Sequence, residues 1–403
     1  MENTSSAVGC RLVFVGEDGD VYAANGRGVP RRLTFGWNDP GEADRLYYVW
    51  PSYSPDGSHV ACFGVRNGAM PEAGLYTVAD DGVRMHEIWR MREAAPVCES
   101  WSSDSSRIAI LLQSEEDLIL EVADVGDPGR TWHVDRGAPL FWAWSPRDSY
   151  LAVHTGGSRS LYSEARLTVY KVNDGCEEVA LLAPGEFRTP AWSPDGERLA
   201  YVDCSTRGRE YLAFYRVGDD VREIVFPVDG HTVMLWSPDG KTLAVSQALG
   251  DSPHMYSGIT LIDVETGKVR PLVDHELASF FWSPQSDRLV VMSFDESAGM
   301  RWSTVSVDGE VHHVGEAFYP SRELVYFCWF FDQFAASHPL ISPDGNSLVF
   351  AGHMTGARGD EHSSANSVYL APLAGGAPAR RVAPGHFACW DTSLRDAECV
   401  RVG

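Results

Sequence analysis

The sequence is poor in basic residues and has no long hydrophobic run. Of its 403 residues, 33 are Lys or Arg and 56 are Asp or Glu, which gives a formal net charge of −23. This charge argues against binding to nucleic acid and against adhesion to anionic membranes. No stretch is long enough to span a membrane, and residues 1–9 lack the basic and apolar regions of a secretory signal. We expect a cytoplasmic protein; a periplasmic or secreted one is the alternative if a signal peptide was removed.

Several motifs that carry chemistry are also missing. None of the eight cysteines forms a Cys-x-x-Cys pair, and most lie in apolar segments, which favours free buried thiols over a zinc site or a disulfide framework. The chain has no Gly-x-Ser-x-Gly elbow, no phosphate-binding loop and no dinucleotide fingerprint. These absences argue against an α/β-hydrolase and against a nucleotide-dependent enzyme.

What the chain does have is a repeated turn. Its clearest copy is Trp192-Ser193-Pro194-Asp195-Gly196, in which Pro presets one turn position and Gly accepts a positive φ. Each copy is followed by a short apolar segment typical of a buried strand. The copies begin at Tyr53, Trp101, Trp144, Trp192, Trp236, Trp282 and Ile341, with a degenerate one at Trp390.

The turns recur every 40 to 50 residues or so, with about four strands in each interval, which is typical of a β-propeller. We predict an all-β, eight-bladed propeller of four-stranded antiparallel blades that forms a single domain over residues 1–403. Strands within 11–35 and a lone strand at 387–390 are expected to complete one shared blade. Seven blades is the alternative. The repeated tryptophans Trp101, Trp144, Trp192, Trp236 and Trp282 are expected to be buried at equivalent positions between blades.

The repeated Trp-Ser-Pro-Asp-Gly resembles the repeats of TolB-like propellers over essentially the whole chain. It lacks the Gly-His and Trp-Asp signature of the related WD repeats. The resemblance implies a propeller fold. It does not imply one activity, because this fold hosts enzymes, periplasmic scaffolds and regulatory modules alike.

One blade, over residues 316–384, departs from the others. It carries an insertion at 318–334 before its turn and a second long loop at 352–362. In a propeller both departures should lie on one face, where long loops usually carry function. The aromatic part of the insertion, 326–334, has two interpretations. It is either core that fills a wedge between blades or a lid that covers a ligand.

The residues just before each inner strand are expected to line a channel mouth on that face. They are Trp50, Glu99, Trp142, Arg188, His231, His338 and His386, to which the loops add His254, His353, Arg358 and Asp360. We take six of them as ligand-binding candidates: Trp50, Glu99, Trp142, Arg188, Arg358 and Asp360.

Histidines at near-equivalent positions of different blades could converge on a divalent metal ion such as manganese or zinc. The candidate ligands are His231, His338, His353, His386 and Gln333. The alternative is that each histidine caps a strand or bonds to a nearby carbonyl group. Ser337-His338 before a Ser-Pro-Asp-Gly turn is similar to a segment of oligogalacturonate lyases, which are propellers whose manganese is held by histidines and a glutamine. This resemblance implies a ligand role for His338, whereas His353 and Gln333 are candidates by location alone.

Two functions remain open. The first is a monomeric binding scaffold that holds a small molecule or a protein segment at the channel mouth. The second is a metal-dependent lyase or hydrolase with a histidine-lined site at the same mouth. We assign no catalytic residue, and the basic residues that a pectin-cleaving enzyme needs are not evident in this acidic chain.

Overall fold

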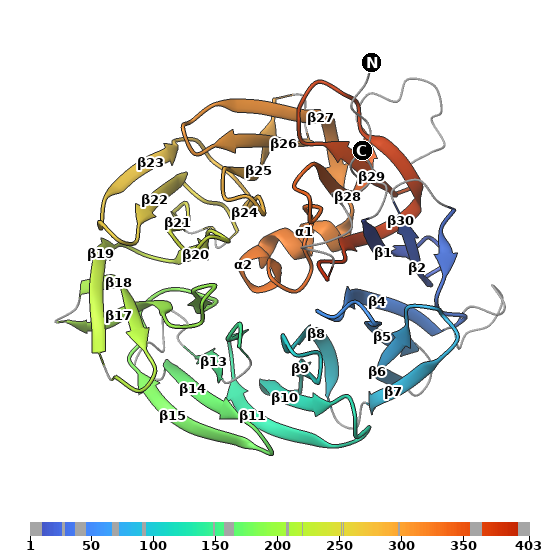
Figure 1. Ribbon diagram of the computed structural model, residues 1–403, viewed down its shortest axis with the longest axis horizontal. Helices are drawn as coiled ribbons and strands as arrows, with labels where there is room; N and C mark the ends of the chain where they lie inside the picture. The colour runs from blue at the N-terminus through green and yellow to red at the C-terminus, as the bar shows by residue number, and fades with distance from the viewer. Residues whose placement is uncertain are drawn as a thin grey trace.

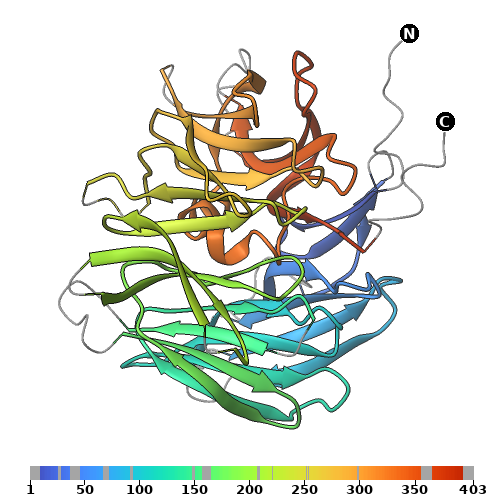
Figure 2. The ribbon, with the colours of Figure 1, turned by 60° about the vertical axis from the view of Figure 1, so that its left-hand side comes forward.

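The computed structural model describes residues 10–25, 29–36, 46–66, 72–90, 94–147, 150–156, 165–206, 209–219, 221–250, 252, 254–296, 299–354 and 365–393. Antiparallel sheets follow one another in chain order around a common axis, so the fold is a β-propeller (Figure 1). The turned view of Figure 2 shows the sheets side by side along the ring.

Five sheets have four strands each. The first contains β4 (Leu46–Tyr53), β5 (His59–Arg66), β6 (Glu72–Ala79) and β7 (Met85–Arg90). The second contains β8 (Ala95–Trp101), β9 (Arg107–Gln113), β10 (Leu118–Asp124) and β11 (Thr131–Gly137). The third contains β12 (Leu140–Trp144), β13 (Tyr150–Thr155), β14 (Arg166–Val172) and β15 (Cys176–Leu182). The fourth contains β16 (Ala191–Trp192), β17 (Leu199–Thr206), β18 (Arg209–Arg216) and β19 (Val221–Val228). The fifth contains β20 (Thr232–Trp236), β21 (Thr242–Gln247), β22 (Ile259–Asp263) and β23 (Val269–Val273).

The remaining strands form one continuous sheet of ten. In spatial order they are β24 (Ser279–Trp282), β25 (Arg288–Asp295), β26 (Gly299–Ser306), β27 (Val311–Pro320), β28 (Ser347–Met354), β29 (Ser367–Pro372), β30 (Arg380–Trp390), β1 (Arg11–Gly16), β2 (Val21–Asn25) and β3 (Arg31–Arg32). The two longest strands join neighbouring units, because the end of β27 pairs with β28 and the two halves of β30 pair with β29 and β1. This arrangement is consistent with the expected eight blades.

The two ends of the chain meet in this sheet, which confirms that prediction. Strand β1 pairs with β30 from Leu12 opposite Trp390 to Val15 opposite Phe387. Residues 398–402, which could have added a further strand to the shared blade, lie outside the described residues. The shared sheet closes the ring without leaving a free edge at the junction.

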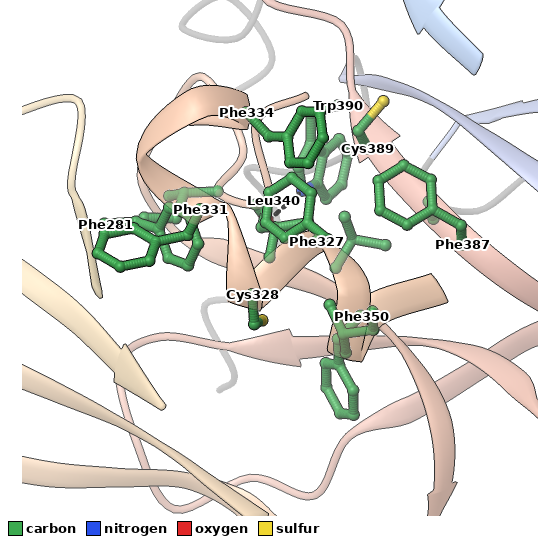
Figure 3. Packing of buried hydrophobic residues seen from close by; sticks show 14 of the residues in the cluster. Phe281, Phe327, Cys328, Phe331, Phe334, Leu340, Phe350, Phe387, Cys389 and Trp390 are labelled. Atoms are coloured by element: carbon green, nitrogen blue, oxygen red, sulfur yellow. Dashed lines mark hydrogen bonds between the residues drawn. The ribbon is translucent and has the colours of Figure 1, made fainter. Parts of the chain in front are cut away.

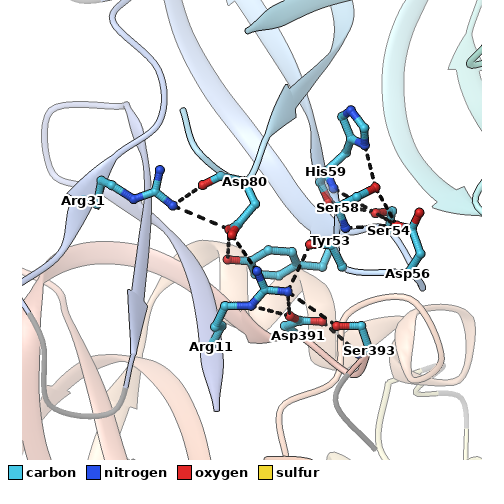
Figure 4. Close-up of polar contacts among 11 residues, drawn as sticks. Arg11, Arg31, Tyr53, Ser54, Asp56, Ser58, His59, Asp80, Asp391 and Ser393 are labelled. Carbon is cyan, nitrogen blue, oxygen red and sulfur yellow. Dashed lines mark hydrogen bonds and ion pairs between the residues drawn. The ribbon is translucent and has the colours of Figure 1, made fainter. Parts of the chain in front are cut away.

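A polar cluster fastens the junction (Figure 4). The Arg11 guanidinium donates to the Asp391 carboxylate at 2.8 Å and to the Asp80 carboxylate at 2.6 Å. It also donates to the Gly57 carbonyl oxygen at 3.0 Å. The Asp391 side chain is fully buried, so its charge depends on Arg11 for compensation. Arg11 thus joins the N-terminal strand, the C-terminal turn and the first four-stranded sheet.

The repeated turns have the geometry that their sequence predicts. In the copy at 192–196, the Ser193 hydroxyl donates to Asp195 at 2.5 Å, and Asp195 also accepts the Glu197 backbone N–H at 3.0 Å. Gly196 has a φ of 72°, the left-handed conformation that favours glycine. The motif therefore fixes a tight hairpin between the first two strands of each unit.

The repeated tryptophans join neighbouring units. In five of the copies the indole N–H donates to a backbone carbonyl of the preceding unit, over 2.9 to 3.3 Å, whereas the buried indole nitrogen of Trp101 has no such partner. The pairs are Trp144 with Ser100, Trp192 with Ala143, Trp236 with Ala191, Trp282 with Leu235 and Trp390 with Leu340. The burial prediction is confirmed for Trp101, Trp192 and Trp282, whereas Trp144 and Trp236 are only half-buried.

The aromatic insertion forms two short helices at the centre of the ring, α1 (Arg322–Trp329) and α2 (Phe331–Phe334) (Figure 1). Ser321 caps α1 by accepting the Leu324 backbone N–H at 3.1 Å. We call residues 322–334 the plug. No helix in the described residues is long and apolar enough to cross a membrane.

The plug is part of the hydrophobic core. Phe327, Phe331 and Phe334 are at most 2% exposed. They pack between Phe281 on one side and Phe387 on the other (Figure 3). The core interpretation of the insertion therefore holds, but these rings fill the axis of the ring and not a wedge between two blades.

The closing cluster generates a prediction about stability. Replacing Arg11 by Met (R11M) leaves the buried Asp391 carboxylate unpaired, so we expect the free energy of unfolding to fall by about 3 kcal/mol. Urea denaturation measures the loss. The control is Arg90→Met, which removes an exposed ion pair with Glu87 and should leave the free energy of unfolding nearly unchanged. Equal losses in the two variants would show that the cluster does not hold the ring closed.

Candidate functional site

The residues expected to line an open channel mouth are mostly buried. Glu99 and Trp142 are each 1% exposed, Arg188 is 3% exposed and His338 is fully buried. Trp50 is half-buried. The structure does bring these five residues together around the axis, but they contact the plug and one another. They hold the plug in place, and of the five only Trp142 also lines the recess described below.

Arg188 anchors the junction between the two helices of the plug. Its guanidinium lies 2.8 Å from the Asp332 carboxylate, and both side chains are buried. It also donates to the Trp329 carbonyl oxygen and to the Tyr256 hydroxyl. The guanidinium lies 5.7 Å from the centre of the Phe330 ring, which adds a cation–π contact. Removing either charge would leave the other buried without its counter-ion.

Gln333 bridges the plug to the inner strand β12. Its side-chain oxygen accepts the Trp142 backbone N–H at 3.1 Å, and its side-chain N–H donates to the Trp142 carbonyl at 2.9 Å. The amide thus caps the inner edge of the strand as another strand would. The side-chain oxygen and nitrogen of Gln333 are thus both hydrogen-bonded to the backbone of Trp142. This arrangement does not support the predicted role of Gln333 as a metal ligand.

Trp50 is held in a strained conformation against the plug. Its φ is 52°, an unusual value for a bulky residue. Its ring stacks on Phe334, with centroids 5.1 Å apart, and contacts His338 and Phe387 at 5.9 and 5.1 Å. Strain of this kind persists only where surrounding packing compensates for it. Here the plug supplies that packing.

Glu99 and His338 face each other within this core. The Glu99 Oε1 atom accepts the Ser52 hydroxyl at 2.5 Å and lies 3.9 Å from His338 Nε2. His338 Nδ1 lies 2.8 Å from the Ser337 hydroxyl. Burial raises the pKa of Glu99 to about 8 and lowers the pKa of His338 to about 3. Both groups are therefore neutral at pH 7, and the pair is not a salt bridge.

The predicted metal-binding histidines do not form a cluster. His338 lies behind the plug, whereas His353 is on β28 and stacks on Tyr319 at 4.9 Å. His386 is on β30, where its carbonyl oxygen accepts the Ser321 hydroxyl. His231 precedes β20, on another sheet. Across the residues that the structure describes, no group of three or more His, Cys, Asp or Glu side chains is placed to hold a metal ion.

The remaining loop candidates give little support to a site at this mouth. His254 stacks on Trp329 with ring centroids 4.7 Å apart, so it packs against the end of α1. The pKa of His254 is lowered mainly by burial and, to a smaller extent, by the nearby positive charge of Arg188. Arg358 and Asp360 lie outside the described residues.

A recess is found at the other end of the inner strands. It has a volume of about 700 Å³, and its floor is formed by the plug and the loop that follows, including Asp332, Gln333, Ala336 and Ser337. Its wall contains the repeated turns, with the prolines Pro146, Pro194, Pro238, Pro284 and Pro343. These turns follow the inner strands, whereas Arg188 and His231 precede the inner strands β16 and β20. The recess is therefore on the opposite side of the plug. Contrary to expectation, Trp50, Glu99 and Trp142 lie within β4, β8 and β12 and not before them.

Sequence reasoning missed this recess although its signal was present. The wall is built from the repeated motif itself, whose Trp and Pro side chains were interpreted as structural. A concave, mainly apolar surface with a few polar groups such as Thr189, Gln333 and Ser337 is typical of a ligand site. We take the recess as the candidate functional site.

The buried Glu99 carboxyl generates a prediction about pH. In the folded chain Glu99 stays protonated up to about pH 8, whereas in the unfolded chain it loses its proton near pH 4.5. The folded state therefore binds one more proton between these pH values, and the free energy of unfolding falls as the pH rises from 4.5 to 8. His338 has the opposite effect, which ends near pH 6.5. Between about pH 6.5 and 8, the free energy of unfolding of the unchanged protein should therefore fall by about 2 kcal/mol because of Glu99, and this fall should be absent in Glu99→Gln.

Urea denaturation at several pH values measures this difference. The control is Glu87→Gln, because the pKa of Glu87 is lowered, first by its hydrogen bond with Arg90, and should not contribute between pH 6.5 and 8. Parallel pH profiles for Glu99→Gln and the unchanged protein would contradict the assignment of a neutral Glu99.

Comparisons with known proteins identify the fold. No family model matches the chain. The Tol-Pal system protein TolB of Alcanivorax borkumensis is 34% identical over 79 residues, which cover 19% of this chain and 18% of that protein. TolB of Mannheimia succiniciproducens is 35% identical over 90 residues, which cover 22% of this chain and 20% of that protein. The matched segment thus spans about a fifth of each relative.

Two solved structures share the propeller fold. Oligogalacturonate lyase in complex with manganese is 15% identical and has a TM-score of 0.51, covering 75% of this chain and 87% of that one. A eukaryotic initiation factor is 10% identical and has a TM-score of 0.52, covering 96% of this chain and 98% of that one. At such identities the likeness concerns the fold alone. The chain thus has the β-propeller fold, and it is similar to TolB over about a fifth of its length.

Proposed function

We propose that this protein is a binding scaffold whose recess holds a segment of another protein. The observation that carries the proposal is the recess of about 700 Å³, which the plug closes from behind and the repeated turns surround. Because the recess is closed at one end, it can enclose either a chain terminus or the tip of a loop of the partner protein. The ring of sheets holds its wall rigid, which reduces the entropy lost on binding.

Three features favour a scaffold over an enzyme. The buried candidates Glu99, Arg188 and His338 are engaged with the plug and its surroundings. The histidines expected to hold a metal ion belong to no group of three or more possible ligands in the described part of the chain. Around the recess, the polar side chains of the floor are few, and Gln333 is already hydrogen-bonded at both ends. The lyase alternative would need a metal site that the described residues do not form.

The similarity to TolB supports a protein partner. The relatives are named as members of the Tol-Pal system, a name that places them with other proteins. We propose a comparable role for this chain, and the same similarity favours the periplasmic alternative over the cytoplasmic location first expected. We further propose that residues 1–403 form a single eight-bladed propeller that acts as a monomer.

A photo-crosslinking experiment tests the proposed function. Ala336 is exposed and lies on the floor of the recess, so replacing it by p-benzoylphenylalanine places a reactive group inside the site. The control position is Val311, which is 52% exposed on β27. We expect crosslinks from position 336 alone, and peptide mapping should place them in one defined segment of the partner.

A second variant makes the result specific. Ser337→Trp would fill part of the recess and should abolish the crosslink from position 336. Because the change also removes the hydroxyl beside His338 Nδ1, near-ultraviolet circular dichroism checks that the variant keeps its fold. Crosslinks that survive this variant, or that form equally from position 311, would contradict binding in the recess.

A further inference from the structure

We propose that the recess selects a cationic group, so that the bound segment inserts a basic side chain. This inference deepens the proposed function and rests on it. It concerns the chemistry of the occupant. We infer this chemistry from the types of side chain that line the recess and from the types that do not.

Indole rings dominate the wall. Six tryptophans contribute to it: Trp101, Trp142, Trp144, Trp192, Trp236 and Trp282. Of these, Trp144 and Trp236 are the more exposed, because they are half-buried whereas the other four are buried. Indole is the aromatic side chain that attracts cations most strongly, and this attraction increases when the cation loses contact with water.

In the part of the wall that the structure describes, no cationic side chain is available to pair with an anion. Among the described residues that line the recess, none is Lys, Arg or His. The charged lining residue in that set is Asp332, and Arg188, its counter-ion, does not line the recess. The Asp332 carboxylate is buried and paired with Arg188 at 2.8 Å, so its charge is largely compensated and the indole rings remain the main attraction for a cation. An inserted carboxylate or phosphate would lose water and gain no counter-ion.

The charge of the whole chain acts in the same direction. With a formal net charge of −23, the protein attracts cations and repels anions at long range. The rim contributes less, because Asp239 beside the recess proline Pro238 lies 3.9 Å from Lys241. We therefore place the selectivity in the indole-lined interior, which salt screens less than the rim.

Three small probes of one shape and different charge test the inference. They are choline, 3,3-dimethylbutan-1-ol and 3,3-dimethylbutyrate, which carry a trimethylated or tert-butyl group with a charge of about +1, 0 and −1 near neutral pH. Ligand-observed NMR titration of the full chain measures their affinities. We expect choline to bind about fivefold more tightly than the neutral alcohol, and the acid to bind most weakly.

Variants locate the effect. Trp236→Leu and Trp144→Leu should each reduce the preference for choline to less than about twofold. The matched control is Trp329→Leu, because Trp329 is 42% exposed at the end of α1 and does not line the recess. Near-ultraviolet circular dichroism checks that each variant keeps its fold. Each wall variant also loses the indole hydrogen bond to a neighbouring unit. Agreement between two variants at different places in the wall would show that the lost preference comes from the indole rings and not from one local change.

The outcomes separate this inference from the proposed function. If the alcohol or the acid binds as tightly as choline, or if choline does not bind while crosslinking from position 336 persists, the selectivity for cations is wrong and the recess remains a binding site. If no probe binds and position 336 forms no crosslink, both proposals fail.

Discussion

The axis of the ring is filled by the plug, and the rest of the structure depends on this filling. Protein interiors are packed as densely as organic crystals, so a channel left between many inner strands would forfeit contacts along its whole length. Here the blade over residues 316–384 supplies two short helices that occupy the axis. Phe327, Phe331 and Phe334 on these helices form the aromatic core shared by several blades.

Polar contacts orient this aromatic core. Hydrophobic packing has little directional preference, so the position of the plug is specified by the buried Arg188–Asp332 ion pair and by the amide of Gln333 on β12. Each contact reaches a different sheet, because Arg188 precedes β16 and the amide binds β12. The plug therefore links the blades across the axis, while the repeated tryptophans link them around the circumference.

The plug also makes the two mouths of the ring different. On one side it covers Glu99 and His338, which remain neutral because burial disfavours their charged forms. On the other side it forms the floor of the recess. A single insertion thus removes one potential site and creates another, and this accounts for the location of the candidate site among the repeated turns.

The sequence was sufficient to predict the propeller because its signals are local. The Ser193–Asp195 contact and the positive φ of Gly196 follow from the residues of the turn alone. The pairing of β1 with β30 follows from counting incomplete units at the two ends. These features require no knowledge of what lies across the ring.

The site could not be predicted in the same way because it depends on contacts between distant segments. Glu99 and Arg188 have the sequence positions of mouth residues, and nothing near them indicates that residues 322–334 will cover them. Conversely, Trp144 and Trp236 belong to the structural motif, yet they remain half-buried because the plug leaves that end of the axis open to a recess. The direction in which an insertion folds decides both outcomes.

Hydrogen exchange of the backbone amides in residues 322–334 tests the central claim most directly. If the plug is an integral part of the core, these amides should exchange as slowly as those of the inner strands β12 and β20, through unfolding of the whole ring. Exchange of the plug within seconds, while the inner strands remain protected, would show that the axis is not filled as described and that the recess has no fixed floor.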